Sequence, residues 1–199
     1  MMQRYRAGFT LIELLVAGSV SLVFVLSVIP NLFHLSQSLR VRLAASEIVG
    51  VLRAARQKAI LSGSNVAVKF DPSLEKRVTF TLYRDGDGDG VLNKDIESGI
   101  DPSIGPAREL VHLGQRIRFG FPLGPAPTDP SDASRKLTNL DDPIRFNRSD
   151  LASFGPLGGS TPGSLYITDG SRHLSVVRVF GYTGKVTILV YNPKTGTWR

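Results

Sequence analysis

A run of alternating aspartates and glycines lies near the middle of the chain, in the segment DGDGDGVLN that begins at Asp85. Calcium loops of the EF-hand type place oxygen ligands at their first, third, fifth, seventh and ninth positions, with a turn-permitting glycine sixth. Here the sixth position is Gly90, and the ligand positions hold Asp85, Asp87, Asp89, the main-chain carbonyl of Val91, and Asn93. The spacing therefore predicts a calcium site.

The loop departs from the calcium pattern at its twelfth position, where a bidentate glutamate is expected and Ile96 is found. Glu97 or Asp101 could replace that ligand if the loop connects strands rather than helices. The alternative interpretation is a surface turn, because Gly and Asp dominate turns without any ligand. Three carboxylates this close together repel one another, however, and a divalent cation would relieve the repulsion. Both interpretations stay open at this stage.

Other chemistry finds little support in the sequence. The chain has no cysteine, which excludes thiolate metal clusters and cysteine nucleophiles. It also has no nucleophile elbow, zinc-protease helix motif or phosphate-binding loop, and its three histidines lack ligand spacing. We therefore expect that the protein is not an enzyme, and calcium is the one cofactor that the sequence suggests.

The elements that position these residues begin with an apolar N-terminal run. Residues 9–29 carry one charge, Glu13, and follow Arg4 and Arg6. A helix of this length would span roughly 30 Å, the thickness of the hydrocarbon core of a bilayer, and the arginines before it predict a cytoplasmic N-terminus. A cleaved secretory signal fits less well, since its apolar region is shorter and ends in a small-x-small site, which is missing before Pro30.

The segment Arg4-Tyr5-Arg6-Ala7-Gly8-Phe9-Thr10-Leu11-Ile12-Glu13-Leu14-Leu15 resembles the class III signal of type IV pilins and type II secretion pseudopilins. The resemblance implies cleavage by a prepilin peptidase between Gly8 and Phe9, N-methylation of Phe9, an assembly role for Glu13, and a helix kink at Pro30. We hypothesise that the new amine on Phe9 approaches Glu13 of a neighbouring subunit, so that each charge offsets the desolvation of the other.

Further along the chain, apolar residues recur every three to five positions up to Ala59 with charged residues between them, which predicts an amphipathic helix that stops near Ser62. Beyond it, short runs alternate apolar and polar residues, which is typical of antiparallel strands. Strands are expected at 66–70, 78–83, 109–113, 116–119, 144–147, 164–168, 173–180 and 185–191, with long loops at 120–143 and 148–163 and no second helix.

The predicted fold class is α+β: a long N-terminal helix, membrane-spanning in its first half, packed on a mainly antiparallel β-sandwich head. The predicted domains are a leader peptide at 1–8, a transmembrane helix at 9–30, its amphipathic continuation at 31–63 and the head at 64–199.

Both ends of the chain resemble the GspH/FimT pseudopilins. The similar segments are Ala45–Ile60 followed by Val66–Val68, and Gly181–Val186 with Trp198, whereas residues 85–163 match little. The resemblance implies a minor pilin or pseudopilin, anchored by a single pass in the bacterial inner membrane with a periplasmic head and assembled into a periplasmic or extracellular fibre. The implied partners are the prepilin peptidase, other pilins or pseudopilins, the inner-membrane assembly platform and membrane lipid.

DNA binding is the main alternative function, because some FimT-like minor pilins bind DNA during natural transformation. The whole chain carries a net charge of +7, and without the leader 22 basic residues face 17 acidic ones. A basic strip on the C-terminal sheet could bind along the phosphates of DNA, and its residues would be Arg172, Arg178, Lys185, Lys194 and Arg199.

A membrane-tethered binding protein that never polymerises is a third hypothesis. A secretion system, a pilus and a competence system all stay open as the setting of such a protein.

Overall fold

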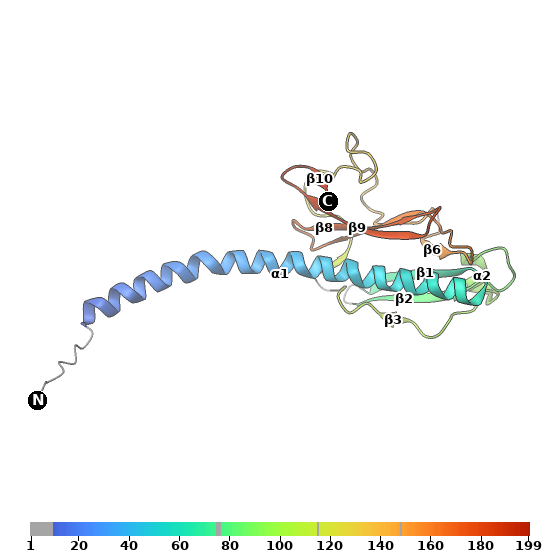
Figure 1. The fold of residues 1–199 in the computed structure, drawn as a ribbon, viewed down its shortest axis with the longest axis horizontal. Coiled ribbons are helices and arrows are strands. Elements are labelled where there is room, and N and C mark those ends of the chain that lie inside the picture. Colours follow the sequence, from blue (N-terminus) through green and yellow to red (C-terminus); the bar gives the residue numbers. More distant parts are fainter. Residues whose placement is uncertain (1–9, 75–76, 115, 148) are drawn as a thin grey trace, which may run out of the picture. The chain divides into compact units, whose positions relative to one another are not determined.

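The computed structural model describes residues 10–74, 77–114, 116–147 and 149–199 (Figure 1). The chain is divided into two units between Ser38 and Leu39, and helix α1 contributes to both. In chain order the elements are α1 (Leu11–Ser62), β1 (Val66–Leu74), β2 (Arg77–Arg84), α2 (Asn93–Ser98), β3 (Arg108–Glu109), β4 (Arg118–Phe119), β5 (Ile144–Arg145), β6 (Leu151–Phe154), β7 (Gly163–Thr168), β8 (Leu174–Phe180), β9 (Lys185–Asn192) and β10 (Thr197–Trp198).

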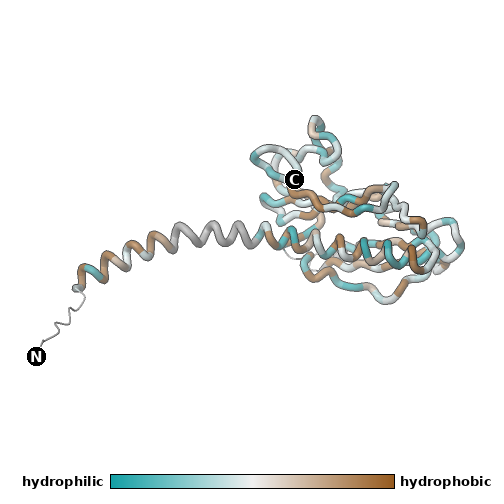
Figure 2. Tube along the Cα trace, in the orientation of Figure 1, coloured by the Kyte–Doolittle hydropathy of each residue, from teal (hydrophilic) through white to brown (hydrophobic). Residues whose placement is uncertain are grey.

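The first unit consists of the N-terminal part of α1. Its residues 11–24 are exposed. They are mostly apolar, as the colours of Figure 2 show, and Glu13 interrupts the apolar run near its start. A membrane span needs about 20 consecutive, predominantly apolar residues. In the part of the chain that the structure describes, no helix meets the length and apolarity that crossing a membrane requires. The predicted fold class, with a membrane-spanning first half of a long N-terminal helix, is therefore wrong; the structure supports a mainly antiparallel β-sheet body.

In the second unit, residues 39–199, which we call the body, α1 buries one face against the strands. The buried side chains recur at helical spacing, which keeps them on one side of the helix: Val41, Ala44, Ala45, Ile48, Leu52, Ala55 and Ala59. Leu39 and Leu43, which the sequence places on the same stripe, are each 49% exposed. The helix ends at Ser62, where the prediction put its end, and Gly63 follows with φ 66° in the left-handed conformation that commonly terminates helices.

Two antiparallel sheets form the rest of the body. The first has the order β3-β2-β1-β6, and its central hairpin pairs Val68 with Leu82 and Phe70 with Phe80. The second has the order β10-β9-β8-β7-β4, and β5 also pairs with β7. One apolar core joins α1 to both sheets, and the Phe70 and Phe119 rings meet edge to face within it.

The second sheet is buried on both faces. Leu165, Ile167 and Val177 belong to the core shared with α1, whereas Tyr166 and Val176, which alternate with them, pack under the segment 120–143. The lone tryptophan of the chain fastens that segment, because the Trp198 indole donates a hydrogen bond of 2.8 Å to the Thr128 carbonyl. The long loop predicted here is thus irregular but packed.

The outer face of the first sheet carries the aspartate-rich segment. Val91 is buried with Ala67 and Leu151, and Ile96 from α2 packs against the same cluster. Two of these elements were missed from the sequence: α2 lies where no second helix was expected, and β6 lies inside the predicted loop 148–163. Both elements position the aspartates described next.

Candidate metal centre

The aspartate-rich loop leaves the sheet directly after β2. The Asp85 amide donates a hydrogen bond to the Asn65 carbonyl, so the first residue of the loop is held beside the end of α1. A Cβ atom on Gly86 would overlap the carbonyl oxygen of Ile100, and Gly90 has φ 103°, a conformation that side chains disfavour. The alternating glycines are therefore required by the path of the backbone as well as by a calcium pattern.

Asp85 organises the loop through both carboxylate oxygens. It is 8% exposed, and it accepts hydrogen bonds from the Asn65 side-chain amide at 2.7 Å, from the Gly88 amide at 2.7 Å and from the Gly90 amide at 3.0 Å. Burial raises the pKa of Asp85, but these hydrogen bonds outweigh it and hold the pKa below its usual value. The carboxylate is thus kept ionised at the base of the loop.

Asp87 and Asp89 complete a group of three carboxylates. One oxygen from each of Asp85, Asp87 and Asp89 lies within 4.8 Å of the others. Burial and the negative charge of Asp87 raise the pKa of Asp89, and the ammonium of Lys94 opposes them. Asp87 and Asp89 are exposed, and exposed acidic clusters are common without a metal, so this group does not by itself establish a site.

The other predicted ligands have different surroundings. The Val91 side chain is buried, and the Asn93 side chain is engaged elsewhere: its Oδ1 accepts a hydrogen bond from Lys69 Nζ, and its Nδ2 donates one to the Ser149 carbonyl. Asp101, proposed as a replacement for the twelfth ligand, is 1% exposed and accepts hydrogen bonds from the amides of Gly86 and Leu92, both at 2.9 Å. Asp101 therefore closes the loop as a structural group. Glu97, the other proposed replacement, is exposed on α2.

Asp95 is a carboxylate that the spacing argument did not select. It lies on α2, is 4% exposed, and its Oδ2 is buried without a hydrogen-bond partner among the described residues. The ammonium of Lys94 lies 3.6 Å from this oxygen and 3.8 Å from Oδ2 of Asp89, so the two carboxylates flank one cation. The sequence held a signal, because Asp95 is the eleventh residue of the loop, directly before the position where the calcium pattern fails.

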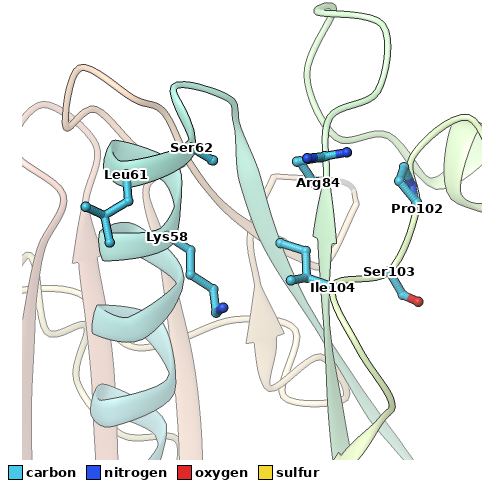
Figure 3. Close-up of a pocket in the computed structure, with 7 residues that line it drawn as sticks. All are labelled: Lys58, Leu61, Ser62, Arg84, Pro102, Ser103 and Ile104. Atoms are coloured by element: carbon cyan, nitrogen blue, oxygen red, sulfur yellow. The ribbon is translucent and has the colours of Figure 1, made fainter.

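A pocket of about 570 Å³ lies near the base of the loop, between the end of α1 and the end of β2 (Figure 3). Lys58 and Ser62 line its helix side, and Arg84 and Ile104 line the opposite side. Two cations and no acidic side chain contribute to the described lining, which is the wrong donor set for a metal ion. The candidate metal centre is therefore confined to the carboxylates of the loop and α2.

The residues predicted at the N-terminus are only partly covered by the structure. Gly8 and Phe9 lie outside the described residues, and α1 continues through Pro30. Glu13 and Thr10 form a capping box: Glu13 Oε2 accepts hydrogen bonds from the Thr10 amide and hydroxyl, both at 2.8 Å, and the Glu13 amide donates to that hydroxyl. In the single chain, Glu13 therefore stabilises the start of its own helix.

The basic strip proposed for DNA is weakened at its centre. The Arg178 guanidinium donates hydrogen bonds to the Pro130 carbonyl and the Ser131 hydroxyl, and it lies over the Phe180 ring. Arg178 thereby holds the 120–143 segment against β8. Arg172, Lys185, Lys194 and Arg199 are exposed, and DNA binding stays an untested prediction.

Comparison with known protein families gives one match. The family model for the type II transport protein GspH matches residues 44–181, which is more than half of the chain and runs from the buried face of α1 to the turn after β8. No curated protein and no solved structure matches the chain significantly. GspH proteins are structural pseudopilins rather than enzymes, associate with other pseudopilins and belong to the envelope-associated secretion machinery. The resemblance noted in the sequence is thus confirmed, and the chain belongs to the GspH family.

Proposed function

We propose that this protein is a minor pseudopilin that is matured by a prepilin peptidase and assembled into a type II secretion pseudopilus. The family match over residues 44–181 carries the proposal, because it covers most of the buried helix face, the whole first sheet, strands β4, β5, β7 and β8 of the second sheet, and the aspartate-rich loop. The body would act on the periplasmic side of the bacterial inner membrane, in contact with neighbouring pseudopilins and the assembly platform. Its mechanism would be mechanical, through subunit packing.

Maturation is the first step of this proposal. Cleavage between Gly8 and Phe9 would remove Arg4 and Arg6 and leave a positive amine on Phe9, with Glu13 as the fifth residue of the mature chain. The amine of one subunit would then face the Glu13 carboxylate of the next. Pairing two charges in a poorly hydrated environment offsets the desolvation of each, whereas a misplaced subunit leaves both unpaired. This difference would favour the correct register in the fibre.

Mass spectrometry of the N-terminus of the protein purified from its native host tests the proposal. We expect a mature chain that begins at Phe9 and carries one methyl group on its amine. A control host without its prepilin peptidase should yield the chain with residues 1–8 retained. Retention of these residues in a host with an active peptidase would contradict the proposed maturation and, with it, assembly into a pseudopilus.

A further inference from the structure

We propose that the body binds one calcium ion between the aspartate-rich loop and helix α2, through the carboxylates of Asp85, Asp87, Asp89 and Asp95. The loop supplies three of these groups, which already lie within 4.8 Å of one another. Helix α2 supplies the fourth, in place of the glutamate that the calcium pattern lacks at Ile96. This inference is independent of the proposed role in secretion.

The main argument is the buried oxygen of Asp95. A carboxylate oxygen withdrawn from water loses its hydration, and natural structures compensate nearly all such atoms with a hydrogen bond or a bound ion. Asp95 Oδ2 accepts no hydrogen bond from the described residues, although Asp85 and Asp101, buried close by along the chain, each accept at least two. This Asp95 oxygen faces the largely exposed ammonium of Lys94 at 3.6 Å but accepts no hydrogen bond from the described residues, which is costly for folding and suited to a cation.

The position of the Lys94 ammonium indicates where a cation is attracted by the carboxylates. Its ammonium lies between Asp89 and Asp95 at 3.8 and 3.6 Å, too far for hydrogen bonds to either, and its side chain is 70% exposed. A long, exposed lysine side chain can move into water without disturbing the backbone. We infer that calcium displaces this ammonium and draws the two carboxylates together.

The donor set favours calcium over other metals. All four groups are carboxylates, which excludes the nitrogen and sulfur ligands that zinc prefers. Calcium takes six to eight oxygen ligands at roughly 2.3–2.6 Å and tolerates irregular geometry, whereas magnesium needs a near-ideal octahedron and gives up its waters reluctantly. Asp87 and Asp89 are exposed whereas Asp85 and Asp95 are buried, and such an irregular set of ligands suits the larger and more tolerant ion.

Calcium would fasten the loop to the first sheet. Val91 and Ile96, on the loop and on α2, pack against Ala67 and Leu151 of β1 and β6. An ion that joins the loop to α2 therefore stabilises the packing of Val91 and Ile96 on this sheet. Because the four carboxylates come together only in the folded chain, the ion binds the folded chain and not the unfolded one. At about 100 times its dissociation constant, such an ion should raise the melting temperature by roughly 5–10 °C.

Isothermal titration calorimetry of the purified full-length chain, stripped of metal with a chelator, tests the proposal. We expect one calcium ion per chain, with magnesium at the same concentration binding much more weakly. Asp95→Asn should weaken calcium binding at least tenfold, because it removes the charge and one ligand while keeping the shape of the side chain. Glu97→Gln removes the same charge from an exposed position on the same helix and should change the affinity less than twofold.

A second variant covers the case in which Asp95→Asn fails to fold, which circular dichroism would reveal. Lys94→Met removes the competing ammonium from an exposed side chain and should make calcium binding tighter, and weaker binding in this variant would contradict the proposal. The proposal is overturned by the absence of binding at millimolar calcium to the folded wild-type chain. Equal losses in Asp95→Asn and Glu97→Gln would also overturn it, since they would indicate diffuse attraction to an acidic surface.

Discussion

At the scale of single residues, Asp169 shows how one carboxylate fixes a turn. Its Oδ1 accepts hydrogen bonds from the amides of Ser171, Arg172 and His173, each at 3.0 Å, and its Oδ2 lies 2.6 Å from Nδ1 of His173. Burial raises the pKa of Asp169, but these hydrogen bonds outweigh it and hold the pKa far below its ordinary value. The turn between β7 and β8 therefore depends on an ionised carboxylate.

We predict that Asp169→Asn lowers the free energy of unfolding at pH 7 by roughly 1–3 kcal/mol. In the wild type, the depressed pKa contributes stability that is complete above the ordinary carboxylate pKa and is lost as the pH falls toward the folded value. The difference between wild type and variant should therefore shrink from about pH 5 to pH 3. Urea unfolding at several pH values measures it, and a difference that stays constant over this range would contradict the prediction. Glu97→Gln, at an exposed position, is the control.

The candidate metal residues show what spacing can and cannot predict. Asp85, Asp87 and Asp89 were found from their alternation, because neighbouring loop residues two apart are close in any compact turn. Asp95 was missed, since its burial depends on how α2 packs on the sheet through Ile96. Asn93 fits the pattern by type, but the structure pairs it with Lys69 and Ser149. Residue types thus predicted part of the cluster, and tertiary packing decides the rest.

At the scale of elements, Glu47 joins α1 to the segment after β3. Its two carboxylate oxygens accept hydrogen bonds from the amides of Val111 and His112, at 2.8 and 2.9 Å. Among the described residues, no strand offers an acceptor to these amides, so the Glu47 side chain supplies the acceptors that a sheet would otherwise provide. The position of the segment 110–114 therefore depends on one residue of the helix.

We predict that Glu47→Ala lowers the free energy of unfolding by about 1–2 kcal/mol and speeds hydrogen exchange of the Val111 and His112 amides at least tenfold. Glu47→Gln retains one acceptor oxygen, so its effect should lie between those of wild type and Glu47→Ala. Hydrogen exchange followed by mass spectrometry measures the local effect. Unchanged exchange at these two amides in Glu47→Ala would show that other contacts hold the segment.

The elements that the sequence predicted well are those with a clear period. In the hairpin of β1 and β2, Lys69 and Thr79 are less buried than the apolar residues on either side of them. The strands expected at 164–168, 173–180 and 185–191 match β7, β8 and β9 to within a residue. β6 was missed because it has only four residues and because Leu151, on the outer face of the sheet, is as apolar as Ala152 and Phe154, which face the core. Ser153 is its one polar residue, which is too few to reveal an alternation. Helix α2 was missed because six residues are too few for a helical period.

At the scale of the whole molecule, assembly and helix capping make different demands on Glu13. The capping box with Thr10 needs a side-chain acceptor, which glutamine also provides. The proposed pairing with the amine of a neighbouring subunit needs a negative charge, which glutamine lacks. The pair of variants Glu13→Gln and Glu13→Ala therefore separates the two roles.

We predict that both variants are cleaved after Gly8 like the wild type and that both enter sheared pseudopilus fractions at levels reduced roughly tenfold or more. Quantitative immunoblotting of those fractions measures incorporation, and mass spectrometry of the N-terminus controls for maturation. If Glu13→Gln were incorporated at the wild-type level and Glu13→Ala were not, the cap alone would explain the requirement, and the charge-pairing hypothesis would fail.

The position of Trp198 makes the body its own optical probe. The indole bonds to Thr128 and lies 5.0 Å from the Tyr191 ring, on the side of the second sheet that the 120–143 segment covers. Its fluorescence therefore reports whether the 120–143 segment is packed on the second sheet. The aspartate-rich loop packs on the first sheet through a different cluster, so changes in that loop should affect this fluorescence little. A quencher titration of the purified chain, in which Trp198 is the one tryptophan, would follow detachment of the segment without an added dye.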